Sequence, residues 1–254
     1  PNADGNPKNG NANVLSWLVV PNEASAMDPT GNRTPFYPQN GGWNAFYNVA
    51  PKFYNTFEKD DLRKEAILTE YWTKDGIKVT KNDIGVKWDG FICNKFPVET
   101  PGTFQGTDIP LARWADVLLM YAEAEVRLSK AAPTASAISA VNEVRNRANG
   151  SVVADRDIYK TTMSYDDLAE AAYNEHGWEI AGYYWGNIAT RARDMFRMNR
   201  IKDHFEYRKL NPEIEVAPGV FRKEAVSVSG TWNDSKMYLP RPFVDSSINP
   251  NLKN

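Results

Sequence analysis

The stretch DIPLARWADVLLMYAEAEVRL, residues 108–128, predicts the helix around which the fold is built. Pro110 can occupy its first turn, and Asp108 precedes it as a possible cap. The apolar residues recur at intervals of three and four, which places them on one face of an α-helix. They are Leu111, Trp114, Leu118, Tyr121 and Ala122. We therefore expect a helix that packs through this face.

The charged residues of the same stretch admit two interpretations. Arg113 with Asp116, and Glu123 with Arg127, have the spacing of ion pairs along a helix surface. A catalytic centre would direct such groups at a substrate, whereas a scaffold would pair them with one another. The choice between these interpretations decides whether the protein is expected to be an enzyme.

Three further helical segments follow. Pro133 ends the first helix, and Thr134 can cap a second one over residues 134–148, so the short connection predicts an antiparallel helical hairpin. A third segment, 164–182, begins with a capping arrangement at its first residue, and a fourth covers about 188–207. Hairpins of this size are the unit of TPR-like arrays.

The remaining segments are irregular, with frequent Pro, Gly and Asn. Residues 59–72 can form a short helix or a strand pair, and residues 76–80 have strand character. We expect a mainly α fold of TPR-like helical hairpins with long irregular loops and a few short strands. A single domain would comprise an aromatic-rich segment 1–107, a helical core 108–209 and a C-terminal loop segment 210–254.

The composition excludes several classes of protein. The formal net charge of −2 and the scattered Lys and Arg residues give no basic patch for nucleic acid. A single cysteine, Cys93, excludes an internal disulfide and a thiolate metal cluster. With two histidines, His176 and His204, a zinc site or a Ser-His-Asp system has little material. We expect no catalytic residues, metal or cofactor.

Aromatic residues form 12% of the chain, and many lie in Asn-, Gly- and Pro-rich segments such as TPFYPQNGGWNAFYN, residues 34–48. A ring in a loop can be part of a local core. It can also be a flat platform for a sugar, whose C–H face stacks on the ring while amides and guanidinium groups bond the hydroxyls. For any one ring the core interpretation is favoured.

DIPLARWADVLLMYAEAE resembles the hallmark helix of the SusD/RagB family, and AISAVNEVRNRA resembles the helix that follows it. Glu175 and Glu179 are similar to the family's E-R-x-x-E-L segment, and Arg191, Asp194 and Arg197 to its R-x-x-D-L-I-R segment. MYLPRP (237–242) and NPNLKN (249–254) resemble the family's terminus. In the first part of the chain only FEKDDLRK is similar. His176 replaces the usual arginine, and GYYWGN (182–187) replaces the usual junction.

The resemblance implies a surface-exposed outer-membrane lipoprotein that binds glycans or other nutrients and caps a SusC-like TonB-dependent transporter. Family members are longer, so the resemblance implies that a lipid-anchored cysteine and further TPR helices lie upstream of residue 1. It also implies that aromatic rings on loops bind the glycan. The candidate ligand-binding residues are Trp17, Arg33, Phe36, Tyr37, Asn40, Trp43, Asn44 and Tyr47.

Two alternatives remain beside this non-catalytic binding protein. In a glycoside hydrolase, Glu175 and Glu179 would be the carboxylate pair, although residues one helical turn apart share a helix face instead of flanking a substrate. If the protein is not a hydrolase, we expect these carboxylates to be scaffold and to pair with Arg191, Arg193 or Arg197 across a helix contact, because unpaired buried charges are costly. The second alternative is a helical module that serves only to dock the transporter.

Overall fold

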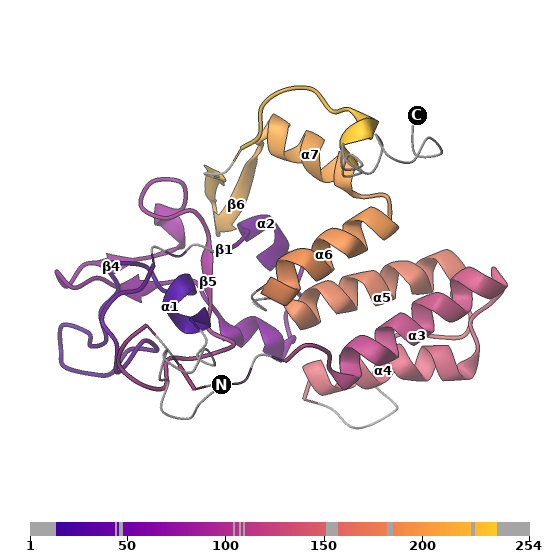
Figure 1. The fold of residues 1–254 in the computed structure, drawn as a ribbon, viewed down its shortest axis with the longest axis horizontal. Helices are drawn as coiled ribbons and strands as arrows, with labels where there is room; N and C mark the ends of the chain where they lie inside the picture. The colour runs from indigo at the N-terminus through magenta and orange to yellow at the C-terminus, as the bar shows by residue number, and fades with distance from the viewer. Residues whose placement is uncertain are drawn as a thin grey trace, which may run out of the picture.

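This computed structural model describes residues 14–43, 45, 48–103, 105–106, 108, 110–150, 157–181, 185–224 and 227–237, without the side chains of 185–189 and 236–237. The described part is mainly helical, as predicted, with a few short strands. The longer helices lie side by side in one half, and the irregular segments with the short strands form the other half (Figure 1).

The helical half of the described chain consists of five helices, of which α4 and α5 begin with side-chain caps. Thr134 Oγ1 accepts a hydrogen bond from the Ala137 amide at 3.2 Å, and Ser164 caps the next helix, as predicted. Asp108 is not a cap, because the first helix begins later and its start is bonded by Asp116, which accepts from the Arg113 amide at 2.9 Å. The helices are α3 (Trp114–Ser129), α4 (Ala135–Ala148), α5 (Tyr165–Ile180), α6 (Trp185–Arg197) and α7 (Ile201–Leu210).

The predicted fourth helix, 188–207, is two helices. The chain leaves helical geometry between α6 and α7, where Asn199 adopts a positive φ of 55°. The change of direction separates α7 from the stack of α3 to α6 (Figure 1). The periodicity of the sequence is continuous across this point, so it did not indicate the break.

Alanines let the helices of this half approach closely. α3 packs against both α4 and α5, which makes it the central helix of the group. Ala122 of α3 is completely buried, as are Val141 of α4 and Leu168 of α5, all in one hydrophobic cluster. The predicted antiparallel hairpin of α3 and α4 is therefore confirmed, and α5 completes a three-helix layer.

The irregular half has an aromatic core. Tyr71 packs edge-on against Phe36 and Trp88, and Phe91 is completely buried beside them. The strand β5 is central to the order β1-β5-β2, and β3 pairs with β4, all antiparallel. The elements are α1 (Leu15–Val19), β1 (Asn48–Val49), α2 (Pro51–Tyr54), β2 (Ile67–Leu68), β3 (Tyr71–Trp72), β4 (Lys78–Val79), β5 (Phe91–Cys93) and the 3₁₀ helices η2 (Leu62–Ala66) and η3 (Lys81–Asp83).

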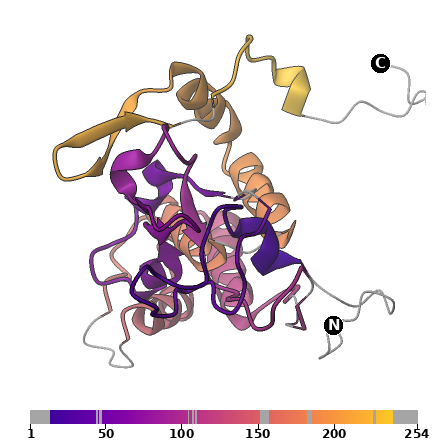
Figure 2. The ribbon, with the colours of Figure 1, turned by 90° about the vertical axis from the view of Figure 1, so that its left-hand side faces the viewer.

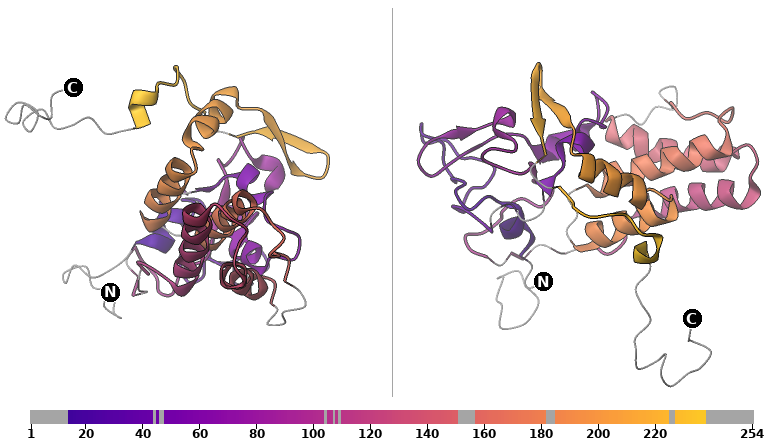
Figure 3. Two further views of the ribbon diagram at one scale, coloured as in Figure 1. Left: turned by 90° about the vertical axis from the view of Figure 1, so that its right-hand side faces the viewer. Right: turned by 90° about the horizontal axis from the view of Figure 1, so that it is seen from above.

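Residues 59–72 contain the short helix η2 followed by the strands β2 and β3, but these two strands do not form the predicted pair, because β2 pairs with β5 and β3 with β4. The strand predicted within 76–80 is β4. The C-terminal segment was predicted as loop, but it contains a hairpin of β6 (Glu213–Ala217) and β7 (Val220–Lys223), followed by the 3₁₀ helix η5 (Asp234–Met237). Val216 anchors the hairpin in the aromatic core, and Figures 2 and 3 show it over the irregular half.

Candidate functional site

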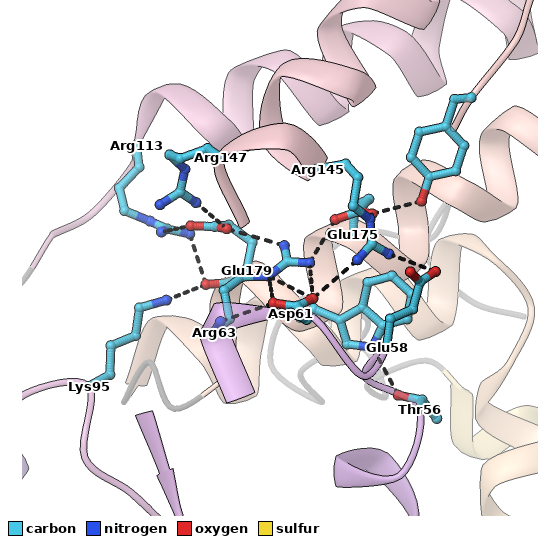
Figure 4. Close-up of polar contacts among 12 residues, drawn as sticks. Thr56, Glu58, Asp61, Arg63, Lys95, Arg113, Arg145, Arg147, Glu175 and Glu179 are labelled. Carbon is cyan, nitrogen blue, oxygen red and sulfur yellow. Dashed lines mark hydrogen bonds and ion pairs between the residues drawn. The ribbon is translucent and has the colours of Figure 1, made fainter. Parts of the chain in front are cut away.

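Glu175 and Glu179 lie on one face of α5 at the boundary between the two halves, inside a cluster of arginines (Figure 4). Both are buried, with 0% and 2% of the residue surface exposed. Glu175 Oε1 lies 2.6 Å from Arg145 Nε, and its Oε2 lies 2.9 Å from Arg63 Nη2. The Tyr159 hydroxyl donates to Glu175 Oε1 at 2.7 Å. Both carboxylate oxygens of Glu175 are thus engaged.

Glu179 is held by three guanidinium groups, those of Arg63, Arg113 and Arg147. The Lys95 ammonium donates to the backbone carbonyl of Glu179 near the end of α5. Burial alone would raise the pKa of Glu179, but Lys95 and the arginines outweigh it and hold that pKa below its usual value. A general acid needs a raised pKa, so Glu179 is unsuited to that role.

Asp61 connects the irregular half to this cluster. It caps η2 by accepting from the Arg63 amide at 3.0 Å and pairs with the Arg63 guanidinium at 2.6 Å. Arg145 Nη1 lies 3.3 Å from Asp61 Oδ2, and its guanidinium carbon stacks on Trp178 at 4.8 Å from the ring centroid. Because one set of arginines binds carboxylates from both halves, the cluster acts as a joint between them.

The cluster confirms some predicted ion pairs and corrects others. Arg113 with Asp116 pairs at 2.9 Å and Glu123 with Arg127 at 2.6 Å, as predicted. The predicted partners of Glu175 and Glu179 were wrong. The arginines that bind Glu175 and Glu179 lie on η2, on α4 and at the start of α3. The predicted partners lie on α6, which faces another side of α5, and there Arg197 pairs with Glu123 and Asp194.

His176 forms a second buried ionic contact, between α3 and α6. Its Nδ1 lies 2.7 Å from Asp194 Oδ2, and its Nε2 lies 3.5 Å from Asp116 Oδ1. Burial would lower the pKa of His176, but the hydrogen bonds and charges of the two carboxylates outweigh it and raise that pKa to about 9. The imidazole is therefore cationic at neutral pH, which keeps a positive charge at the position where the family usually has arginine.

The loop-borne aromatic residues form a different kind of site. The rings of Trp17 and Trp43 meet edge to face, with centroids 4.8 Å apart at 73°. Trp17 belongs to α1, and Trp43 follows the Gly41–Gly42 pair. Trp43 has 53% of its surface exposed. The pair therefore consists of two crossed rings, of which Trp43 keeps about half of its surface in solvent.

Backbone hydrogen bonds hold the Trp43 loop against α1. The Trp43 amide donates to the Trp17 carbonyl at 2.7 Å, and the Gly42 amide donates to the Pro21 carbonyl at 3.1 Å. A Cβ on Gly42 would lie 2.4 Å from the Trp17 carbonyl oxygen, so a side chain has no room there. The glycine is what allows the loop to bring the two tryptophans together.

A pocket of about 390 Å³ opens beside Trp17. Three segments of the irregular half build its wall, which consists of Trp17, Asn22, Pro38, Gln39, Asn40, Gly41, Gly42, Pro101, Gly102 and Thr103. The third segment is shaped by Gln105, which is completely buried. Its Oε1 accepts from the amides of Glu99 and Thr100, and its Nε2 donates to the Gly102 carbonyl at 3.0 Å.

The candidate ligand-binding residues do not all lie at this pocket. Trp17 and Asn40 line the pocket and Trp43 stands against Trp17. Arg33 and Tyr37 contact each other, with the guanidinium carbon 4.0 Å from the ring centroid. The remaining candidates are Phe36, Asn44 and Tyr47.

Phe36 was a wrong candidate, because it is 1% exposed and packs in the aromatic core, which leaves no ring face for a ligand. Asn44 and Tyr47 lie outside the described residues. Sequence reasoning missed Asn22, Gln39 and the 101–103 segment. The Gly41–Gly42 pair hinted at a close approach of the backbone, but nothing in the sequence connected it to residues 101–103, about sixty positions later.

The described residues do not provide a metal site or a membrane-spanning helix. No group of three or more His, Cys, Asp or Glu side chains there is placed to hold a metal ion. Cys93 is buried, and burial raises the pKa of its thiol. Within the same residues, no helix has both the length and the apolar character to cross a bilayer.

Comparison with known structures gives related folds at low sequence identity. A SusD homologue from Bacteroides thetaiotaomicron matches with a TM-score of 0.58 and 19% identity over 78% of this chain and 40% of that one. NanU of B. fragilis (TM-score 0.52) and a SusD superfamily protein from Parabacteroides distasonis (0.51) each match with 19% identity over 94% of this chain. These matches cover 46% and 45% of the two structures, so the chain spans less than half of each.

No curated protein matches the sequence. The model of the SusD family, SusD_RagB, matches residues 21–254, which is most of the chain and includes the helical half and the residues of the pocket wall other than Trp17. The hallmark helix, the shared fold and this match agree. The chain belongs to the SusD family.

Proposed function

We propose that this chain binds glycan at the cell surface without catalysis and delivers it to a SusC-like TonB-dependent outer-membrane transporter. The observation that carries the proposal is the Trp17–Trp43 pair beside a pocket lined with amide side chains. Rings present apolar faces to sugar C–H groups, and amides donate to and accept from hydroxyls. Membership of the SusD family supports the same role.

The proposal places the protein on the outer membrane as a surface lipoprotein, anchored by a lipid upstream of residue 1 and extended there by further TPR-type helices. Support comes from the family, whose members are typically surface lipoproteins, and from the greater length of the matching structures. The division of the chain at residues 107 and 209 stays a prediction. No part of the proposal involves a cofactor or nucleic acid.

A glycoside hydrolase is the less favoured alternative. Glu175 and Glu179 share one helix face, and each is bound by two or more guanidinium groups. A glycosidase needs carboxyl groups on opposite sides of the scissile bond, with one of them protonated. The two carboxyl groups do not flank a substrate, and the lowered pKa of Glu179 disfavours its protonation, which supports a role of the charged cluster as scaffold.

A docking module is the other alternative, and one observation favours it. α3 exposes a row of apolar side chains, with Trp114 65%, Val117 45% and Tyr121 45% exposed. A row of this kind can contact another protein. It lies in the helical half, away from the pocket, so glycan binding and docking can coexist on one chain.

Incubation with a panel of oligosaccharides separates the three. We expect saturable heat of binding by calorimetry and unchanged oligosaccharides by chromatography after prolonged incubation. Released products would contradict the proposal in favour of a hydrolase. If the protein neither binds the oligosaccharides nor releases products, the docking module is the alternative that remains.

A further inference from the structure

Among the described residues that line the pocket, none carries a charged side chain. The polar side chains of the wall are the amides of Asn22, Gln39 and Asn40 and the hydroxyl of Thr103. From this we infer that the ligand segment held in the pocket is electrically neutral, a run of unmodified sugar residues without carboxylate, sulfate or phosphate groups. The inference rests on the proposed function and adds the chemical class of the glycan.

The chemistry of the wall carries the inference. Amides and hydroxyls both donate and accept hydrogen bonds, which matches sugar hydroxyls, since these also do both. An anionic group only accepts, and proteins bind it with Arg, Lys or clustered backbone amides. An anion moved into this pocket would lose hydration without gaining a cationic partner, which is costly.

Gln39 adds an independent observation. It is 6% exposed, and its Nε2 donates to the Gly41 carbonyl at 2.6 Å. Its Oε1 has no hydrogen-bond partner within the described part of the chain. A rotated amide would set this oxygen against the Gly41 carbonyl, so the assignment of the two atoms is fixed by that contact. A buried acceptor without a partner favours donors around it and disfavours an anion.

One cation, Lys74, lies beside the wall and is engaged by a backbone carbonyl of a lining residue. The Lys74 ammonium donates to the Asn22 carbonyl at 2.8 Å, and it lies 2.8 Å from where a Cβ of Gly41 would be. It therefore stands on the side of Gly41 that packs against residue 22, and it is not part of the pocket lining. The side-chain amide of Asn40 is also partly engaged, because its Oδ1 accepts a hydrogen bond from the Ala26 amide at 2.8 Å.

The test uses pairs of oligosaccharides that differ only at C6, each neutral glycan beside its oxidised counterpart, in which the hydroxymethyl group has become a carboxylate. On an array and then by calorimetry, we expect binding of one or more neutral glycans and at least tenfold weaker binding of the oxidised partner. Because no charge is involved, Kd should not change between about 0.05 and 0.5 M NaCl.

An engineered cation provides the second arm. Asn22→Lys adds a positive charge to the wall at an exposed position, and it should recover binding of the oxidised glycan while Asn22→Gln should not. Equal or tighter binding of oxidised glycans by the unmodified protein, or a Kd that rises with salt, would overturn the inference and leave the proposed function standing. Failure of both members of every pair would overturn the proposed function and the inference with it.

Discussion

Arg145 Nε lies 2.6 Å from Glu175 Oε1, and neither side chain has any exposed surface. The two residues belong to α4 and α5, and the same guanidinium reaches Asp61 in the irregular half. A carboxylate and a guanidinium that are both excluded from water must stay paired, because either one alone would be an uncompensated buried charge. The relationship makes the charged cluster a structural joint.

Glu175→Gln should therefore destabilise the protein and leave glycan affinity unchanged. The substitution keeps the shape but removes the carboxylate that Arg145 and Arg63 share, which leaves two buried guanidinium groups with less negative charge around them, and the expected loss is about 3 kcal/mol in the free energy of unfolding. Urea denaturation and calorimetry on the same sample measure both quantities. The control is Glu65→Gln on η2, an exposed carboxylate, which should change neither. Loss of binding at unchanged stability would contradict the structural role.

The His176 contact predicts that stability depends on alkaline pH. Its pKa is raised from 6.5 to about 9 in the folded protein, so its contribution is complete below pH 6.5 and disappears as pH rises through about 9. The contribution is at most about 3 kcal/mol. Lys95 has the opposite effect. Burial lowers its pKa to about 8, so its contribution to the stability of the folded protein rises above that pH.

A variant at position 176 separates the pH-dependent contribution of His176 from that of Lys95. His176→Arg keeps a positive charge between Asp116 and Asp194 but does not titrate, so the loss of stability between pH 6.5 and 9 should become smaller than in the unmodified protein. Urea midpoints measured across that range provide the comparison. Identical pH dependence in the two proteins would show that His176 is not the titrating group.

The Gly42 contact predicts that loop geometry limits binding. Gly42→Ala would force a Cβ into the Trp17 carbonyl, so the loop must move and the two tryptophans must separate. We expect at least a tenfold weaker Kd for glycan, with a loss of about 1 to 3 kcal/mol in unfolding free energy. Gly219→Ala, in the open turn between β6 and β7, is the control, and it should leave Kd unchanged. A Gly42→Ala protein with normal affinity would show that the loop does not position the platform.

The helical half of the fold could be predicted because its determinants are local. Thr134 and Ser164 cap their helices through residues three positions later. The face predicted to pack was wrong in part: Ala122 is buried, but Leu111, Trp114 and Tyr121 are exposed, and the buried apolar residues beside Ala122 are Leu119 and Val126. The break at Asn199 is a single backbone conformation inside a continuous helical pattern, and the hairpin of β6 and β7 is stabilised by Val216 in a distant core. Each leaves only a short local signal in the sequence, an asparagine at the break and Pro218–Gly219 between the two strands.

The sites divide in the same way. Asn40 and Trp43 could be proposed because aromatic and amide residues gather in their loop, and Trp17, which lies on α1, because the same part of the chain is rich in aromatic residues. The other pocket wall and the partners of Glu175 depend on contacts between residues far apart in the chain, such as Arg63 with Glu175, and one sequence does not encode such pairs visibly. Phe36 was misplaced because a loop ring that fills a core has the same sequence context as one that faces solvent.

The most direct test of the central claim is the binding isotherm of Trp43→Ala for a glycan found with the unmodified protein. Trp114→Ala, an exposed tryptophan on α3, is the matched control. Removal of the exposed ring should weaken Kd at least tenfold, while the circular dichroism spectrum and the Trp114→Ala isotherm stay unchanged. A folded Trp43→Ala protein with an unchanged isotherm would contradict the claim that the Trp17–Trp43 pair is the glycan platform.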